Sequence, residues 1–174
     1  DTKIPTPYGF TTMGEICVGD TVFDENGKPC RVVAKSDVDD TEQAYRLIFR
    51  DGSSIVAGER HLWNVEHIIG KSQSALWTTG EIYRRTMKHR ERYRDNEKEA
   101  RRSIIRIPAA KTLQIEERSL PIARSCFHYL ADIEPLSEKV PMQCIQVDSS
   151  SHCYLAGESF VPTHNSELAA AVAL

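Results

Sequence analysis

The chain has 174 residues, which is enough for one domain with a hydrophobic core and too few for two domains of typical size. Lys and Arg number 22 against 25 Asp and Glu, so the formal charge of −3 gives no general electrostatic argument for binding nucleic acid or an anionic membrane. Because no apolar run approaches the ~20 residues needed to cross a bilayer, we expect a soluble monomer with neither a membrane nor nucleic acid among its partners.

Short β-strands and tight turns are predicted for residues 2–57. Apolar and polar residues alternate in the segments KIPTPYGF, TVFDENGKPCRVVAKS and AYRLIFRDGSSIVAG. The last two segments contain Asn-Gly and Asp-Gly, which are the strongest short-range signals for a β-hairpin. We therefore expect an all-β N-terminal half built from hairpins.

A charged helix is predicted next, in the segment GEIYRRTMKHRERYRDNEKEARRS. Ile82, Met87 and Tyr93 recur at loose helical spacing among charged residues, which is typical of a solvent-facing helix. The excess of Arg is compatible with phosphate binding. A solvated helix face explains it better, because no aromatic interleaving supports nucleic-acid binding.

From Ser103 onward the β character returns, in SIIRIPAA, HYLADIEPL, VPMQCIQVDS, HCYLAG and SFVPTHN. Between the first two of these, RIPAAKTLQIEERSLPI reads as an extended linker. The pattern predicts two β halves, about 1–66 and 128–165, that flank a variable insert of about 68–127.

The cysteine pattern indicates a reducing, cytoplasmic location. There are five cysteines, an odd number with no C-x-x-C pair, and no secretory leader is recognisable. A disulfide framework or a zinc ribbon is therefore disfavoured, and free thiols are expected. The cysteines are Cys17, Cys30, Cys126, Cys144 and Cys153.

His164, Asn165 and Ser166 stand in a row where the composition changes to the apolar segment SELAAAVAL. An Asn side-chain amide can attack its own backbone carbonyl and break the chain after it, and a neighbouring imidazole can supply the proton that the leaving amine needs. A hydroxyl directly after the Asn can receive an acyl group. Taken alone, the tripeptide is much more typical of a loop with a capping Ser than of a cleavage site, and only its position at the composition break favours the chemistry.

At three places the chain resembles inteins. DTKIPTPYGFTTMGEICVGDTVFD resembles their first block, GERHLW an intermediate block, and CIQVDSSSHCYLAGESFVPTHNS their last two blocks, with the penultimate His and terminal Asn. The resemblance covers most of residues 1–66 and 140–166. It implies a mainly β, horseshoe-shaped Hedgehog/intein (HINT) fold with a short helical or irregular insert, and self-catalysed protein splicing.

The chain departs from ordinary inteins because no Cys or Ser nucleophile opens it, and we expect that a few leading residues and an N-extein precede Asp1. Trp63, Cys144 and Thr163 stand at the three places that mark class 3 inteins, which use the internal Cys instead. A second departure is Gly58, where many inteins have a Thr three residues before the block His.

The resemblance assigns a role to each residue of the site. Cys144 attacks the N-terminal junction as a thiolate to give a branched thioester, and since a free thiol has a pKa of about 8.5, a lowered pKa or a nearby base is expected. His61 donates a proton to the departing amine. Trp63 packs beside Cys144 and positions it, whereas Thr163 is assigned to the site by the resemblance alone and is also typical of a residue at a strand end. Ser166 takes the acyl group, Asn165 cyclises with His164 assisting, and His152 is a further candidate. No cofactor is implied.

Several alternatives remain at this stage. Cys144 and Trp63 are also typical of structural residues buried in a strand or core, and His61 is also typical of a hydrogen-bonded histidine in the core. A His61, His152 and Cys144 metal site is conceivable, although the spacing does not demand it. A Hedgehog-type cleavage-only domain and a non-catalytic β binding module are the competing functions.

The insert and the last nine residues complete the predicted organisation. The insert lacks the paired acidic helix motifs of a homing endonuclease, so a mini-intein is expected over residues 1–165. Residues 166–174 resemble the Ser and helix that follow Gly-Lys in a phosphate-binding loop. They are therefore assigned to a C-extein from a P-loop ATPase, for example a phage terminase large subunit.

Overall fold

The hairpins predicted for the N-terminal half are present in the computed structural model, which describes residues 2–69, 71–122 and 125–165. Successive antiparallel pairs are formed by β1 (Lys3–Thr6) and β2 (Gly9–Thr12), β3 (Thr21–Phe23) and β4 (Pro29–Lys35), and β5 (Ala44–Phe49) and β6 (Ser54–Gly58). Gly27 and Gly52 have φ angles of 75° and 86° in two of the turns, which glycine adopts without strain. The Asn-Gly and Asp-Gly hairpin signals are therefore confirmed.

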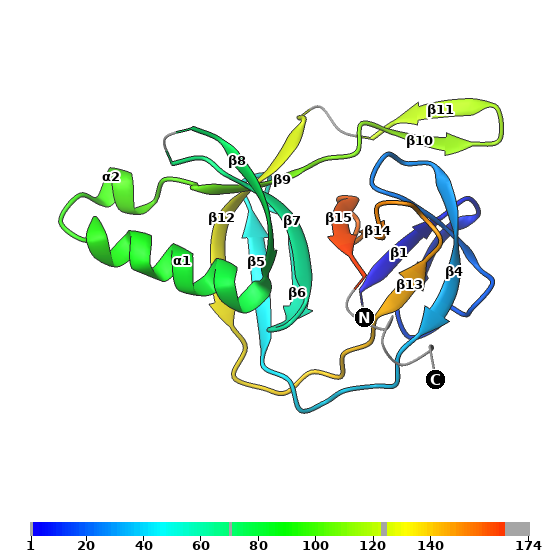
Figure 1. Ribbon diagram of the computed structural model, residues 1–174, viewed down its shortest axis with the longest axis horizontal. Helices are drawn as coiled ribbons and strands as arrows, with labels where there is room; N and C mark the ends of the chain where they lie inside the picture. Colours follow the sequence, from blue (N-terminus) through cyan, green and yellow to red (C-terminus); the bar gives the residue numbers. More distant parts are fainter. Residues whose placement is uncertain (1, 70, 123–124, 166–174) are drawn as a thin grey trace.

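The other elements complete two lobes that lie side by side (Figure 1). In chain order they are β7 (Leu62–His67), β8 (Gln73–Thr78), α1 (Thr79–Arg92), α2 (Glu97–Ala100), β9 (Ile105–Pro108), β10 (Thr112–Ile115), β11 (Arg118–Pro121), β12 (Phe127–Pro135), β13 (Ile145–Val147), β14 (Cys153–Ala156) and β15 (Val161–His164). The large lobe holds a six-stranded sheet in the order β6-β5-β12-β9-β7-β8. The small lobe holds the β13-β4-β3 sheet and the β1–β2 and β14–β15 hairpins. The prediction of a mainly β fold is confirmed.

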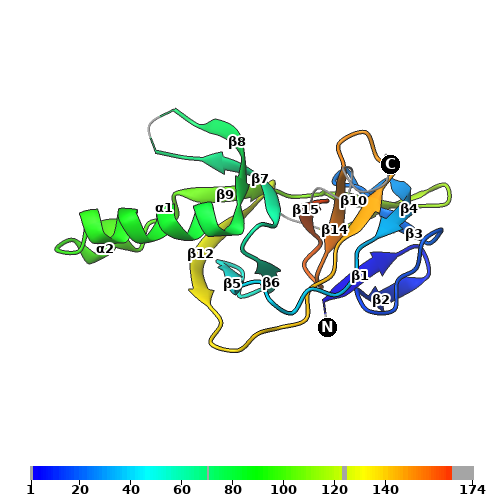
Figure 2. The same cartoon turned by 60° about the horizontal axis from the view of Figure 1, so that its bottom comes forward.

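Helix α1 begins with a capping box, the sequence signal for which is Thr-x-x-Glu. Thr78 Oγ1 accepts from the Glu81 N–H at 3.2 Å, and the Glu81 carboxylate accepts from the Thr78 N–H at 2.8 Å. Ile82 is fully buried, whereas Arg85 and Lys88 are exposed. Figures 1 and 2 show α1 and α2 on the outer side of the large lobe, away from the small lobe. The predicted solvent-facing helix is confirmed.

Residues 105–122 do not form the extended linker that the sequence suggests. Strand β9 lies between β12 and β7 in the six-stranded sheet, and β10 and β11 form a separate hairpin. Ile105 and Ile107 are both buried because alternate residues of a strand point to the same face. The linker interpretation is therefore wrong for β10 and β11, whose polar and proline residues concealed two short strands, whereas β9 lies in the segment SIIRIPAA, for which β structure was predicted.

Two extended segments join the lobes. Residues 36–43 lead from β4 to β5, residues 136–144 return from β12 to β13, and the two cross between the lobes at the bottom of Figure 1. The Asp39 N–H donates to the Met142 carbonyl at 2.9 Å, and the Met142 N–H donates to the Asp39 carbonyl at 2.8 Å. Cys144 lies where the returning segment enters the small lobe.

One hydrophobic cluster contains residues of both lobes. Ile4 and Val22 from the small lobe belong to it together with Leu47 and Ile133 from the large lobe. The lobes are thus packed together, which fixes the positions of side chains that approach one another from opposite sides. Among the described residues, no helix has the length and apolarity that a membrane span requires.

Candidate functional site

Cys144 lies directly before β13, at the meeting point of the two lobes. Its N–H donates to Ser36 Oγ at 3.0 Å, and its carbonyl accepts from the Ser36 N–H at 2.9 Å, so the neighbouring segment holds the backbone on both sides. The residue is half-buried, and its Sγ atom is 4.0 Å from Nδ1 of His61. A basic nitrogen therefore faces the thiol.

His61 lies in the turn before β7 and connects Cys144 to a second strand. Its N–H donates to the Gly58 carbonyl at 3.1 Å, which fixes the turn. Its Nε2 atom is hydrogen-bonded to Thr163 Oγ1 on β15. Although His61 is 83 residues from Cys144 and 102 residues from Thr163 in the sequence, its ring bridges the thiol and the hydroxyl.

The His61 ring is neutral at physiological pH. Burial of the ring, followed by the charge of nearby His164, lowers the pKa of His61 to about 4. A neutral imidazole has one N–H donor and one lone pair. The contact with Thr163 at Nε2 leaves Nδ1 toward the sulfur, which is the arrangement required of a base for the Cys144 thiol.

Trp63 forms the wall of the site on β7. Its ring is fully buried and meets the His61 ring edge-on, with centroids 4.8 Å apart and an interplanar angle of 65°. Its indole N–H donates to Thr79 Oγ1 at 2.9 Å, and the Thr79 N–H donates to the His61 carbonyl at 2.9 Å. Sequence reasoning missed Thr79, because the capping pattern indicates a helix start but not a contact with a residue 16 positions earlier.

Tyr154 is a second residue that the sequence did not indicate. It is paired with Thr163 across the β14–β15 hairpin, so the two side chains lie on the same face. The ring is 2% exposed, and burial together with the charges of Cys144 and Cys153 raises the pKa of the phenol. Alternation along β14 was the available signal, since it places Tyr154 and Ala156 on one face and Cys153 on the other.

Gly58 leaves space that Glu42 occupies. A Cβ atom at this position would lie 2.5 Å from Glu42 Oε2. The Glu42 carboxylate also accepts from the Arg60 N–H and from the Arg60 guanidinium. The departure from the usual Thr is thus accompanied by a carboxylate that fixes the turn leading into His61.

The Asn165 end of the site is held by local contacts. His164 Nδ1 is 2.7 Å from the Asn165 carbonyl oxygen, and the Asn165 N–H donates to the His152 carbonyl at 2.8 Å. Asn165 is only 7% exposed. The imidazole is therefore beside the carbonyl that an Asn cyclisation attacks.

His152 and Ser166 differ from the other predicted residues. The His152 side chain is exposed, and its ring centroid is 6.3 Å from that of His164, which is beyond direct hydrogen bonding. His152 has a φ angle of 55°, and the structure links it to Asn165 through its backbone carbonyl. Ser166 and the rest of the predicted C-extein lie outside the described residues.

Two other cysteines, the half-buried Cys30 and the buried Cys153, lie where their thiols are less reactive. Burial and the nearby carboxylates raise the pKa of Cys30 to about 12 and that of Cys153 to about 11. Cys17 and Cys126 are exposed. No three or more His, Cys, Asp or Glu side chains among the described residues are grouped to hold a metal ion, so the conceivable His61, His152 and Cys144 site does not fit this arrangement.

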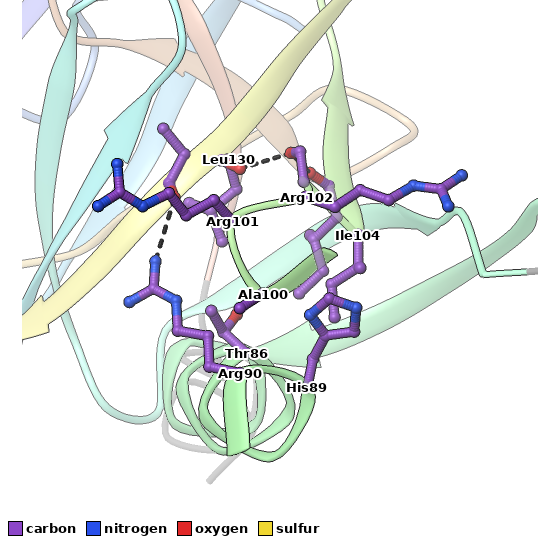
Figure 3. Close-up of a pocket in the computed structure, with 11 residues that line it drawn as sticks. Thr86, His89, Arg90, Ala100, Arg101, Arg102, Ile104 and Leu130 are labelled. Carbon is purple, nitrogen blue, oxygen red and sulfur yellow. Dashed lines mark hydrogen bonds between the residues drawn. The ribbon is translucent and has the colours of Figure 1, made fainter. Parts of the chain in front are cut away.

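A separate pocket lies between α1, α2 and β12 (Figure 3). Thr86 and His89 line it from α1, and its volume of about 10 Å³ accommodates about one water molecule. Arg90 donates to the Ala131 carbonyl at its edge, as Figure 3 shows. The pocket is too small for a peptide and contains none of the predicted site residues.

Comparisons with known sequences identify two curated relatives, both described as replicative DNA helicase DnaB. The one from Mycobacterium leprae (strain TN) is 32% identical over 169 residues, which cover 97% of this chain and 24% of that protein. The one from Mycobacterium intracellulare is 46% identical over 66 residues, which cover 38% of this chain and 12% of that protein. This chain thus spans about a quarter or less of their length. No protein-family profile matches it.

Solved structures match nearly the whole chain. The crystal structure of the Msm DnaB1 intein splicing domain bound with zinc is 31% identical, with a TM-score of 0.64, over 95% of this chain and 97% of that chain. The crystal structure of the MchDnaB-1 intein (N145AA) is 30% identical, with a TM-score of 0.62, over 95% of this chain and 96% of that chain. The resemblance seen at three sequence blocks therefore extends through the insert.

Proposed function

The chain belongs to the intein family, and we propose that it splices through Cys144 as an internal nucleophile in place of a first-residue one. Its HINT fold and self-catalysed protein splicing follow from its nearly full-length similarity to DnaB intein splicing domains. The observation that carries the proposal is the series of contacts from the Cys144 thiol through His61 to Thr163. With Trp63 against the ring, this arrangement supports a class 3 intein.

The first step is an acyl transfer to sulfur. Neutral His61 takes the thiol proton at Nδ1, while Thr163 holds Nε2 and orients the ring. The sulfur of Cys144 attacks the carbonyl at the N-terminal junction, a C–S bond forms and the peptide C–N bond breaks. The proton on Nδ1 passes to the departing amine, so His61 acts first as a base and then as the acid that the sequence analysis assigned. The low pKa of His61 favours this return of the proton.

The later steps take place at the Asn165 end. The Ser166 hydroxyl attacks the thioester, which returns the Cys144 thiol and leaves the upstream segment as an ester on Ser166. The Asn165 side-chain nitrogen then attacks its own carbonyl carbon, where a proton on His164 Nδ1 stabilises the developing negative charge on oxygen. The bond to Ser166 breaks, a succinimide remains on the intein, and the freed Ser166 amine takes the acyl group from its own oxygen.

A mini-intein is also inferred. The described residues between β7 and β12 form β8, α1, α2, β9, β10 and β11. Strands β8 and β9 belong to the six-stranded sheet, and only the two short helices and one hairpin project from it. This leaves no separate endonuclease domain among the described residues.

The host is proposed to be a replicative DNA helicase of the DnaB kind. Both curated relatives carry that description, and the M. leprae protein contains the match within a chain about four times as long. The coarser prediction of an ATPase-like host is therefore supported. The phage terminase suggested by residues 166–174 has no support from these relatives.

Intact-mass analysis of the domain between native-like exteins tests the proposed function. We expect ligated exteins from the unsubstituted chain, a thiol-labile branched species from Asn165→Ala, and no processing of the N-terminal junction in Cys144→Ala. Cys126→Ala, which removes an exposed thiol, serves as the matched control and should splice normally. Cleavage of both junctions without ligation would indicate the Hedgehog-type alternative. Unprocessed mass throughout would indicate a binding module.

A further inference from the structure

Asn165 is held by a loop whose own position depends on a distant hairpin. The Asn165 N–H donates to the His152 carbonyl at 2.8 Å. The loop of residues 148–152 is closed by a turn, because the His152 N–H donates to the Ser149 carbonyl at 3.0 Å and Ser149 Oγ donates to the Cys153 carbonyl at 3.0 Å. A displacement of this loop therefore moves the residue that cyclises.

Two contacts attach this loop to the β3–β4 hairpin. The Arg31 N–H donates to Asp148 Oδ1 at 2.8 Å, and the Asp148 N–H donates to the Arg31 carbonyl at 3.0 Å. Ser151 Oγ donates to Glu25 Oε2 across 126 residues of sequence. Ser151 Oγ also accepts from the Cys153 N–H at 3.3 Å, so Glu25 controls the orientation of a hydroxyl at the start of β14.

The turn that carries Glu25 is in turn supported by the β10–β11 hairpin. The Gln114 N–H donates to the Gly27 carbonyl at 2.8 Å, and a Cβ atom at Gly27 would lie 1.8 Å from the Thr112 carbonyl oxygen. Leu113 of β10 packs in one small core with Leu155 of β14. Figure 1 shows this hairpin above the small lobe, on an extension from the large sheet. The β10–β11 hairpin, in a segment for which the sequence suggested a linker, therefore contacts both the turn that carries Glu25 and strand β14.

We infer that Glu25 is a positioning residue for Asn165 cyclisation, braced by the β10–β11 hairpin; this rests on the proposed function of Asn165. It acts on Asn165 through Ser151 and the His152 carbonyl and touches no reacting atom. The hydrogen bonds that position Cys144 and His61 run through Ser36 and Thr163, whereas Glu25 contacts Ser151. Loss of this support therefore affects the second half of the reaction selectively.

Cleavage of the Asn165–Ser166 bond in a Cys144→Ala background measures this step by itself. Glu25→Ala and Ser151→Ala should each slow the cleavage about tenfold, because misplacement of reacting groups by a fraction of an ångström is sufficient for such losses. Glu25→Gln should recover most of the rate, since its amide oxygen still accepts from Ser151. The double substitution should be no slower than Ser151→Ala alone, because Ser151→Ala already removes the contact with Glu25. Lys28→Ala, on the same turn, is the matched control.

A second readout separates this inference from a general structural effect and from the proposed role of Cys144. With Cys144 intact, formation of the branched species should change by less than about twofold in Glu25→Ala. Equal slowing of both steps, or cleavage at the parental rate in both Glu25→Ala and Ser151→Ala, overturns the inference. Absence of any branched species in Asn165→Ala contradicts the role of Cys144 instead, while the cleavage rates still decide the role of Glu25.

Discussion

The Cys144 end of the site draws its side chains from the junction before β13, the turn before β7 and β15, whereas the Asn165 end takes His164 and Asn165 from consecutive positions of one strand end. The first set meets only because the two lobes pack together. The second set is already adjacent in the sequence, and folding supplies only its orientation. In the proposed mechanism, the first acyl transfer therefore depends on packing between the lobes, whereas the cyclisation depends on the 148–152 loop that supports one strand end and on the β3–β4 hairpin that holds this loop.

Removing the Thr163 hydroxyl should produce the largest difference between the rates of the N-terminal step and of Asn165 cyclisation. Thr163→Val keeps the shape of the side chain but removes the hydroxyl that contacts His61 Nε2 and orients the ring, so we expect the N-terminal step to slow about 10- to 100-fold. Asn165 cyclisation, measured as cleavage of the C-terminal junction, should change by less than about threefold. Equal slowing of both steps would show that Thr163 supports the strand end generally rather than the His61 ring.

Removing the anchor of Trp63 should have an intermediate effect. Thr79→Val leaves the buried indole N–H unpaired, which should lower the free energy of unfolding by about 1–3 kcal/mol and slow the N-terminal step about threefold. Thr86→Val is the matched control on the same helix, because Thr86 Oγ1 is buried and has no hydrogen-bond partner among the residues that the structure describes. Denaturant unfolding should place Thr86→Val at or above the parental stability. A loss of stability in Thr86→Val as large as that in Thr79→Val would contradict the stabilising role of the hydrogen bond between Trp63 and Thr79.

Acidity should have the smallest effect on the N-terminal step. With a pKa of about 4, His61 remains a neutral base between pH 7.5 and 5.5, so the rate should vary by less than about twofold. Attack by a thiolate formed without His61 would instead lose about tenfold in rate per pH unit. Rapid-quench measurement of the branched species distinguishes the two profiles.

The same lowered pKa has a consequence for stability. Below pH 6.5 the unfolded chain binds a proton at His61 that the folded chain does not bind. The neutral His61 ring therefore makes its full contribution to the free energy of unfolding above about pH 6.5, and this contribution is lost as the pH falls toward 4. His61→Gln should reduce this acid sensitivity in urea unfolding at pH 5 relative to pH 7. If the difference in the free energy of unfolding between pH 5 and pH 7 is the same in His61→Gln as in the parent, the lowered pKa of His61 is contradicted.

The sequence predicted the hairpins, helix α1 and the Trp63, Cys144 and Thr163 set, because turn residues, periodicity and family motifs are local signals. It did not predict β10 and β11, because the polar and proline residues in these two four-residue strands give a linker-like pattern. Nor did it indicate Thr79. That contribution depends on a contact made after folding, which a single sequence does not record.

The position of the acyl branch shows directly whether Cys144 is the internal nucleophile. In a chain with Asn165→Ala and Ser166→Ala, neither cyclisation nor transfer to Ser166 can consume the first thioester. Free thiols are blocked with iodoacetamide, and the attachment site of the upstream segment is located by peptide mass mapping. We expect the upstream segment to be attached to Cys144 alone. The other four cysteines, Cys17, Cys30, Cys126 and Cys153, should carry no acyl group. Attachment to any other cysteine, or an intact N-terminal junction, would contradict the role of Cys144 as the internal nucleophile.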